Sequence, residues 1–484
     1  MSEADMNNGL YKIRLTPAKC GLDLGDGSER AEYVNQDYIL NKLGRPHRYV
    51  GLMYTYYPND KQWPERISKA CADMKVTYQW DYPYDDYFPY GGGIGGSTEG
   101  EPFSFMRDIR RHGQDAALTL TIDCSVTDEH LRQIARELKP FGRMRLRINH
   151  ECVGDWFTHN RRFSYEQVGA FFARFAAIIK EEAPNISTVF CAGFIDPETG
   201  KIEREKEFAT AYRAADVWSA DCYLALHFSW PYDVAEKGAG GYNFSTVDYY
   251  YNRYKDTAQV LKTLNNGVMK PLTIAEFNVD GDVCGPLHQG DAVLRFARKF
   301  RDNNADWFDG FSLYQFRDRG RLGLEIEDPN NSAVGIEQPL LKEYKELLSD
   351  PYFTPQITEC GGADLPVKLR WGGAEDADGA ALKIRFERSP EFCEVTFDEP
   401  LSLMMEINGR WFYKSPSTKT VDLMPAFFEK PLSGAAELSL NIFATPPDGV
   451  NDPAQGEDSS FNYYAEMTKM PQLRLRYEAL EKIL

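Results

Sequence analysis

Long hydrophobic runs are missing from this chain. No segment of its 484 residues approaches the roughly 20 consecutive apolar residues of a membrane-spanning helix. The first residues, MSEADMNNG, also lack the basic region and the apolar core of a signal peptide. We therefore expect no membrane partner. We expect a cytoplasmic location for the chain as it stands, or a secreted or periplasmic one if a leader was removed.

Clustered positive charge is missing as well. Asp and Glu number 73 against 55 Lys and Arg, which gives a formal net charge of −18. Binding to nucleic acid requires grouped Lys and Arg that neutralise phosphates, so a nucleic-acid partner is not expected. Hydrophobic residues make up 43% and charged residues 26% of the chain, which is the composition of a folded protein rather than of a disordered one.

Motifs for disulfides, metals and cofactors are absent too. The nine cysteines show no CxxC or Cys/His spacing, and Cys124, Cys191 and Cys222 fall inside apolar strand candidates. This pattern indicates buried reduced thiols. No His-x-His follows the first strand candidate, and no Gly-Lys-Ser/Thr follows the glycine-rich stretch at 91–97. We expect neither a metal nor a cofactor.

Between about residues 48 and 348, eight short apolar runs alternate with stretches of helical period. The strand candidates span 48–54, 76–82, 116–123, 143–149, 187–193, 217–223, 271–276 and 310–315. The helix candidates span 60–73, 103–112, 127–138, 164–182, 202–214, 246–264, 289–303 and 338–349, and Ser164 with Gln167 forms a capping box. This alternation predicts an α/β fold, a (β/α)₈ TIM barrel. A doubly wound open sheet is the alternative, but its usual glycine fingerprint is missing.

The pattern changes after Pro351. The segments 381–387, 393–398, 401–408 and 437–444 alternate apolar and polar residues at period two, which predicts an antiparallel β-sandwich. We therefore divide the chain into an N-terminal extension (1–45), a barrel (46–350) and an accessory sandwich domain (351–484). The alternating stretch LYKIRL at 10–15 is expected to add a strand to the C-terminal domain.

Two glutamates stand at the ends of the fourth and seventh strand candidates. The C-terminal strand ends of a TIM barrel carry its active site, so Glu151 and Glu276 are expected to face one cleft. Hydrolysis of a glycosidic bond with retention requires a carboxylic acid that protonates the leaving oxygen and a second carboxylate about 5–5.5 Å away that attacks the anomeric carbon. A neighbouring cation such as Arg147 favours the ionised form of one of the two.

The segment around Glu151 reads Arg147-x-x-His150-Glu151-x-x-Gly154-x-Trp156-Phe157. It resembles the acid/base motif of glycoside hydrolase family 26, a family of β-mannanases and related enzymes in clan A of (β/α)₈ retaining hydrolases. The resemblance implies that Glu151 is the acid/base, that His150 binds the sugar or tunes the acid, and that Trp156 forms a stacking wall.

Two further segments resemble the same clan. Pro271-x-x-x-Ala275-Glu276-Phe277 resembles the nucleophile strand, which implies that Glu276 is the nucleophile. The run Asp216-Val217-x-x-x-Asp221-x-Tyr223 resembles the sixth strand, whose tyrosine bonds to the nucleophile and would here be Tyr223.

The chain also departs from the clan pattern. The tryptophan common at the end of strand eight is absent from Ser312–Asp318, so Tyr314 or Phe316 would have to replace it, with Arg317 nearby. Asn149 stands where family 26 does not require it, although other clan families place an asparagine there. The remaining residues predicted to bind substrate are Arg147, Tyr54, Trp80 and Trp230. The aromatic and glycine-rich loop at 81–97 is either a glycan-binding flap or a surface excursion.

These features predict an enzyme, a retaining glycoside hydrolase that cleaves β-glycosidic bonds of a neutral polysaccharide or oligosaccharide by double displacement. Its partner would be a carbohydrate, with β-mannan the first expectation and β-glucan or xylan next. Two alternatives stay open. One is a non-catalytic carbohydrate-binding protein on a degenerate barrel, which the loss of either glutamate would have favoured. The other is a transglycosylase, which the same two carboxylates support.

Overall fold

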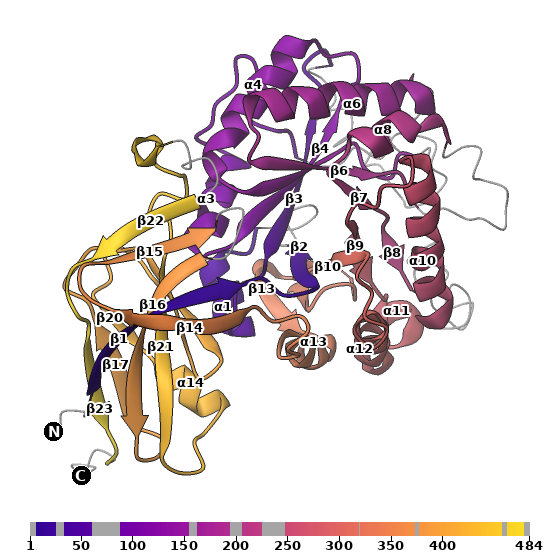
Figure 1. Ribbon diagram of the computed structural model, residues 1–484. Coiled ribbons are helices and arrows are strands. Elements are labelled where there is room, and N and C mark those ends of the chain that lie inside the picture. The colour runs from indigo at the N-terminus through magenta and orange to yellow at the C-terminus, as the bar shows by residue number, and fades with distance from the viewer. Residues whose placement is uncertain are drawn as a thin grey trace.

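The chain folds into a barrel ringed by helices and a β-rich part beside it (Figure 1). The computed structural model describes residues 6–25, 33–60, 88–153, 162–193, 206–224, 247–318, 320–372, 377–456 and 462–478. The β-rich part contains both the first described strand, β1 (Met6–Thr16), and the last, β23 (Gln472–Arg476). Within the described ranges, no helix is both long and apolar enough to cross a membrane.

Eight parallel strands close the barrel. They are β2 (Gly21–Gly25), β3 (Tyr49–Tyr56), β4 (Asp115–Ile122), β5 (Met144–Ile148), β6 (Ile186–Cys191), β7 (Val217–Ser219), β9 (Leu272–Asn278) and β10 (Phe308–Leu313). Each pairs with the next, and β10 pairs back to β2, which confirms the predicted TIM barrel. The two-residue strand β8 (Cys222–Tyr223) extends the sheet beside the end of β9.

The helices cover the outside of the barrel. They are α1 (Gln36–Leu43), α3 (Phe103–Arg111), α4 (Asp128–Leu138), α6 (Tyr165–Glu182), α8 (Ala209–Ala214), α10 (Val247–Leu264), α11 (Gly281–Cys284), α12 (Pro286–Asp302) and α13 (Leu340–Leu348). The predicted capping box begins α6, where the Gln167 N–H donates to the Ser164 side chain at 3.3 Å. The buried face of α6 carries Val168, Phe172 and Phe175, at the spacing of an amphipathic helix.

The first barrel strand differs from the sequence expectation. Strand β2, at 21–25, lies in the stretch treated as an N-terminal extension, while the barrel was expected to begin at 48–54. The expected second strand, 76–82, lies outside the described residues, and β3 pairs directly with β4. Strand β2 is only five residues long. The period of its apolar residues therefore cannot distinguish it from a loop. Glu151 and Glu276 still follow strands four and seven of the barrel, which are β5 and β9 when β2 is counted as the first.

The C-terminal part is a β-sandwich. Its larger antiparallel sheet runs β14 (Gln356–Ala363), β1, β16 (Ala377–Phe386), β21 (Ala436–Ala444), β18 (Leu403–Ile407) and β19 (Arg410–Lys414). Two smaller sheets pair β15 (Val367–Gly372) with β22 (Asn462–Met467), and β17 (Phe392–Thr396) with β20 (Thr420–Asp422) and β23. Side chains from these sheets share one core, for example Leu369, Ile384, Val395 and Ile442. The helix α14 (Met424–Glu429) closes one end of that core.

Strand β1 joins the two parts of the molecule. It lies between β14 and β16, as the stretch LYKIRL led us to expect, with Leu10 opposite Ala363 on one side and Leu382 on the other. Only four residues separate β1 from β2, so the chain passes directly from the sandwich into the barrel. After β10, a small sheet of β11 (Arg317–Asp318), β12 (Glu325–Asp328) and β13 (Asn331–Glu337) precedes α13.

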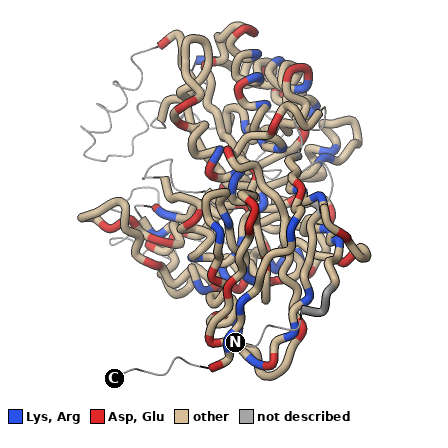
Figure 2. Tube along the Cα trace, turned by 90° about the vertical axis from the view of Figure 1, so that its left-hand side faces the viewer, with Lys and Arg blue, Asp and Glu red and all other residues tan. Residues whose placement is uncertain are grey.

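Acidic and basic residues are interspersed along both parts of the chain (Figure 2), and some of their ion pairs are buried. Asp115, at the start of β4, lies between two arginines: Arg110 Nη1 is 2.6 Å from one carboxylate oxygen, and Arg143 Nε is 2.5 Å from the other. The side chains of Asp115 and Arg110 are 1% and 0% exposed. A buried arginine that loses its only carboxylate partner retains the full desolvation penalty of its charge.

Asp115→Asn should therefore lower the free energy of unfolding by about 3–5 kcal/mol. The matched control is Asp291→Asn, which breaks the i,i+4 pair with Arg295, whose side chains are 63% and 60% exposed. That substitution should cost less than about 0.5 kcal/mol. Denaturant unfolding of the wild type and the two variants measures both changes. Equal decreases in the free energy of unfolding would contradict a larger contribution from the buried Asp115 pair.

Candidate active site

Glu276 is held in one orientation at the end of β9. The Arg147 Nη2 atom donates to its Oε1 at 2.5 Å, and the Tyr223 hydroxyl donates to its Oε2 at 3.0 Å. The His150 Nε2 atom lies 3.8 Å from the same Oε1. The predicted bond between Tyr223 and Glu276 is thus present, and both carboxylate oxygens have a donor.

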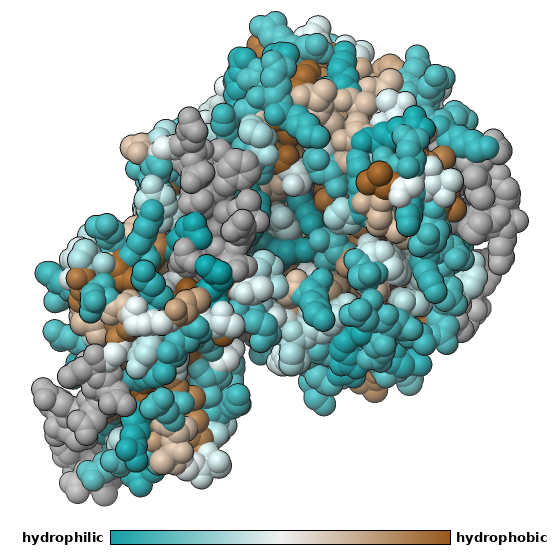
Figure 3. Space-filling view, in the orientation of Figure 1, coloured by the Kyte–Doolittle hydropathy of each residue, from teal (hydrophilic) through white to brown (hydrophobic). Residues whose placement is uncertain are grey.

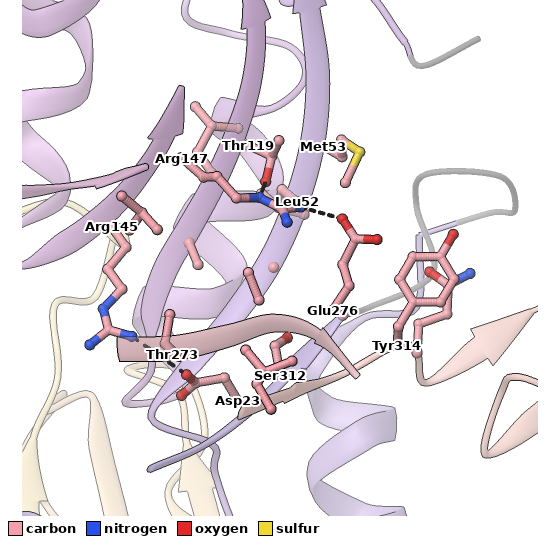
Figure 4. A pocket seen from close by; sticks show the side chains of 18 residues that line it. Asp23, Leu52, Met53, Thr119, Arg145, Arg147, Thr273, Glu276, Ser312 and Tyr314 are labelled. Atoms are coloured by element: carbon pink, nitrogen blue, oxygen red, sulfur yellow. Dashed lines mark hydrogen bonds and ion pairs between the residues drawn. The ribbon is translucent and has the colours of Figure 1, made fainter. Parts of the chain in front are cut away.

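Arg147 connects three strands inside the barrel. Side chains alternate between the two faces of β5, so Arg145 and Arg147 share the inner face, and both line a cavity there. Arg147 Nε donates to the Thr119 hydroxyl at 2.7 Å, and Nη1 lies 3.2 and 3.1 Å from the two oxygens of Asp221. Figure 4 shows the guanidinium between Thr119 and Glu276. One buried guanidinium therefore binds two carboxylates.

Glu151 follows β5 with unusual backbone geometry. The φ angles of Asn149 and Glu151 are +49° and +48°, in the left-handed region that residues other than glycine rarely adopt. Such angles cost about 1–3 kcal/mol each, persist only where the surroundings impose them, and cluster at functional sites. The Asn149 side chain supplies that constraint, because it accepts from the Ile122 N–H at 2.6 Å and donates to the Ile122 carbonyl at 3.1 Å.

The next residues continue the constraint. The Cys152 N–H donates to the Cys191 carbonyl at 3.3 Å, and the Val153 N–H donates to the Ala192 carbonyl at 2.9 Å. These bonds join the segment after β5 to the end of β6. As a result, one carboxylate oxygen each of Glu151, Asp221 and Glu276 lies within 4.8 Å of the other two.

Asp221 is the residue of this group to which the sequence assigns no role. It lies between β7 and β8, and the Cys191 thiol donates to it at 3.4 Å. Burial, together with the nearby charge of Glu276, raises the pKa of Asp221 to about 7, although Arg147 opposes the shift. The signal that could have identified it is an acidic residue inside the apolar run VWSADCY, since a buried carboxylate needs a partner.

A cavity of about 70 Å³ extends through the barrel from Arg145 and Asp23 at one end to Glu276 and Tyr314 at the other (Figure 4). That volume suits a few water molecules, each of which needs roughly 10–15 Å³ of such space. The space-filling view shows the barrel hollowed near its centre, where hydrophilic residues are visible (Figure 3).

Tyr314 forms one wall of this cavity. Its ring packs edge-on against Tyr223, with centroids 5.9 Å apart and an interplanar angle of 80°. Phe316, the other candidate for the position of the missing tryptophan, is fully buried and packs against Tyr38 on α1. Of the two aromatic residues, Tyr314 is therefore the one at the site.

The three clustered carboxylates suit a cation by number and spacing. Arg147 already lies against two of them, within 2.5 Å of Glu276 and 3.1 Å of Asp221. A divalent ion bound there would face this buried positive charge at contact distance. The donor set therefore fits the guanidinium better than a metal.

Three residues predicted to bind substrate are engaged elsewhere. Tyr54 is fully buried and donates to Glu101 at 3.1 Å, because its neighbour Met53 faces the cavity and alternate residues of β3 point outward. Arg317 lies 2.9 Å from Glu325 and forms a buried ion pair with it. Asn149 uses both ends of its amide on Ile122. None of the three lines the cavity beside Glu276, and their contacts with substrate remain predictions.

Trp80, Trp156 and Trp230, also predicted to contact substrate, lie outside the described residues. Part of the glycine-rich loop is described. Its Gly93 N–H donates to Glu137 on α4 at 2.9 Å, and the Tyr90 hydroxyl donates to the same carboxylate at 3.0 Å. These bonds fix the described part of the loop to an outer helix, which favours the surface excursion over a flap.

No protein-family model matches the chain, and no curated protein sequence matches it either. Among solved structures it is similar to a family 51 α-L-arabinofuranosidase from Bifidobacterium longum, with a TM-score of 0.43 and 13% identity over 88% of this chain and 96% of that one. It is also similar to a family 26 endo-β-1,4-mannanase from Cellulomonas fimi (TM-score 0.43, 12% identity, 87% and 93% of the chains). A third is a family 26 β-mannanase from Bacteroides ovatus, with a TM-score of 0.43 and 10% identity over 69% of this chain and 90% of that one. At these values the chemistry of this chain has to be argued from its own residues.

The raised pKa of Asp221 makes stability depend on pH. The folded chain keeps a proton up to about pH 7 that the unfolded chain releases near 3.8, so this contribution is lost as the pH rises between those values. Asparagine carries no such proton. The Tm of Asp221→Asn minus that of the wild type should therefore rise between pH 5 and pH 7 and then level off, as measured by calorimetry. A difference independent of pH, like that expected for the exposed control Asp291→Asn, would contradict the raised pKa.

Proposed function

We propose that this protein is a retaining β-glycoside hydrolase in which Glu276 is the nucleophile and Glu151 the acid/base. The observation that carries the proposal is the approach of their carboxylate oxygens to within 4.8 Å. Retaining enzymes place these groups about 5–5.5 Å apart, whereas inverting enzymes leave about 6.5–9.5 Å for a water molecule. The partner of the site is therefore a carbohydrate.

The contacts of the two glutamates support this division of roles. Glu276 receives N–H and O–H donors from Arg147 and Tyr223, and these two bonds hold its carboxylate in one orientation. Glu151 is half-buried and stands beside two other acidic groups, because one of its carboxylate oxygens lies within 4.8 Å of oxygens of Asp221 and Glu276. An acid that must lose and regain a proton suits the second setting, and an anionic nucleophile suits the first.

In the first step of the proposed reaction, the Glu151 carboxylic acid transfers its proton to the glycosidic oxygen as the bond from that oxygen to the anomeric carbon breaks. Glu276 forms a bond to the same carbon and becomes a glycosyl ester. In the second step, Glu151 removes a proton from water, whose oxygen bonds to the anomeric carbon as Glu276 leaves. One water is consumed, and both glutamates return to their starting states.

The substrate class is a neutral β-linked glycan. The acid/base segment resembles that of family 26, so β-1,4-mannan is the first polysaccharide to test, followed by β-glucan and xylan. Tyr314 offers an aromatic face and a hydroxyl beside Glu276, a combination suited to a sugar ring with its C–H face and hydroxyl groups. Transfer of the glycosyl group to a sugar acceptor would use the same two carboxylates.

Glu276→Ala should abolish activity on every substrate, because no covalent intermediate forms. Glu151→Ala should lower kcat by about 10²–10⁴-fold on polysaccharides. It should affect aryl glycosides of acidic phenols much less, because such leaving groups need no proton. The assay is a panel of polysaccharides and aryl glycosides. Glu181→Gln, on the exposed face of α6, is the matched control and should keep full activity. Full activity in Glu276→Ala would refute the nucleophile assignment.

Retention is tested separately by following the released sugar with proton NMR. The first product from a β-glycoside should be the β-anomer, because two displacements at one carbon restore its configuration. A first product of the α-configuration would mean inversion and a different use of the two glutamates.

A further inference from the structure

A second pocket lies between the barrel and the sandwich, at the end of the barrel opposite Glu151 and Glu276. The barrel residues that line it stand at or just before the first residues of their strands: Gly21, Leu22, His47, Arg48, Asp115 and Arg143. The sandwich contributes Trp371 from β15 and Trp411 from β19. The cavity between them measures about 90 Å³. It shares none of its lining residues with the cavity beside Glu276.

The pocket adjoins a cluster of charged side chains. The cluster contains five arginines and three aspartates, in a chain whose net charge is −18. The arginines are Arg45, Arg48, Arg110, Arg143 and Arg145, and the aspartates are Asp23, Asp115 and Asp309. All three aspartates are paired within this group, as the 2.7 Å contact of Asp23 with Arg48 and the 2.5 Å contact of Asp309 with Arg145 illustrate.

Arg45 is the arginine without an acidic partner among the residues that the structure describes. Its guanidinium donates to the Leu348 carbonyl, to the Thr354 hydroxyl at 2.9 Å and to the Phe353 carbonyl at 3.4 Å, all of them neutral acceptors. Burial lowers the pKa of Arg45 to about 10, which still leaves it charged at neutral pH. A partly buried charge of this kind is stabilised when an anion binds beside it.

His47 adds a hydrogen-bond donor. Burial and Arg45 lower its pKa to about 3, so the ring is neutral. Its Nε2 lies 3.0 Å from the Tyr344 hydroxyl, which has no other hydrogen-bond acceptor among the described residues. We therefore assign the hydroxyl as donor and the ring proton to Nδ1. Nδ1 is buried without a partner in the described part of the chain. Tyr344 does not line the pocket, which leaves Nδ1 as the nitrogen available to a ligand.

The walls of the pocket are aromatic. The rings of Trp371 and Trp411 meet edge to face with centroids 5.8 Å apart, and Phe353 lies on the barrel side. Over the described ranges, neither indole N–H has a hydrogen-bond acceptor in the protein, although the two residues are only 7% and 9% exposed. The pocket therefore combines flat apolar surface with donors and positive charge.

We propose that this pocket binds a small organic monoanion, a carboxylate carried on a flat apolar group. The carboxylate would lie by Arg45 and the His47 Nδ1–H, with the apolar group against Trp371 and Trp411. A single negative charge matches the single arginine that lacks an acidic partner, whereas a phosphate dianion brings more charge than Arg45 neutralises. Because the ligand contacts both domains, its binding stabilises their association.

The test is calorimetric titration of the full chain with benzoate, with benzyl alcohol as the neutral analogue of the same ring, and with inorganic phosphate. One benzoate should bind per chain and raise the Tm. Benzyl alcohol should bind weaker by on the order of tenfold, because it lacks the charge-assisted bond. Equal binding of the two aromatic probes, tighter binding of phosphate, or no binding of benzoate at millimolar concentration would each overturn the proposal.

Variants locate the site. Arg45→Gln should weaken benzoate binding by on the order of tenfold. Because Arg45 also bonds to neighbouring backbone, Trp411→Phe provides a second test: it keeps an aromatic wall, loses the indole N–H and should weaken binding several-fold. Glu276→Gln, at the opposite end of the barrel, should bind benzoate like the wild type. Loss of binding in Glu276→Gln, or unchanged binding in both pocket variants, would overturn the assignment of this site whether or not the protein hydrolyses glycosides.

Discussion

The guanidinium of Arg147 is the contact on which the candidate active site depends. It reaches Glu276 on the seventh strand and Asp221 beside the sixth, while its own backbone lies on the fourth. Burial and the nearby Glu276 raise the pKa of Asp221, so this carboxyl favours its protonated form more than an exposed aspartate does. A barrel interior tolerates such a cluster because each charge is paired and hydrogen-bonded.

The barrel interior contains two layers of ion pairs, and β5 contributes an arginine to each of them. Arg145 and Arg147 are two residues apart, so they point to the same side of the strand. Arg145 pairs with Asp309 at the base, whereas Arg147 pairs with Glu276 at the site. The cavity runs between these two ion-paired layers. Arg48, which lines the interdomain pocket, lies 3.0 Å from the same Asp309 and so connects that pocket to the base layer.

Individual elements show which parts of the fold the spacing of apolar residues can predict and which it cannot. The amphipathic stretch at 164–182 predicts α6 to its capping residue, because its apolar spacing and Ser164 act locally. The five residues of β2 carry no comparable signal, and their place in the barrel is decided by pairing with β3 and β10. Tyr54 and Asn149 illustrate the same limit for side chains. Each stands near a strand end, but strand alternation and a backbone partner turn them away from the cleft.

The sequence by itself determined the barrel, the sandwich, and the two glutamates with Arg147, His150 and Tyr223 near them. Hydrophobic period and residue order suffice for the barrel, the sandwich and the two glutamates, since parallel strands in a barrel must bring their C-terminal ends together. His150 and Tyr223 were indicated by the resemblance to family 26 and its clan. Only the tertiary structure decided that Asp221 joins the cluster, that Tyr314 rather than Phe316 faces the cavity, and that Arg45 lacks an acidic partner. These depend on distances between residues far apart in the chain, and no local pattern records which buried charge has a neighbour and which does not.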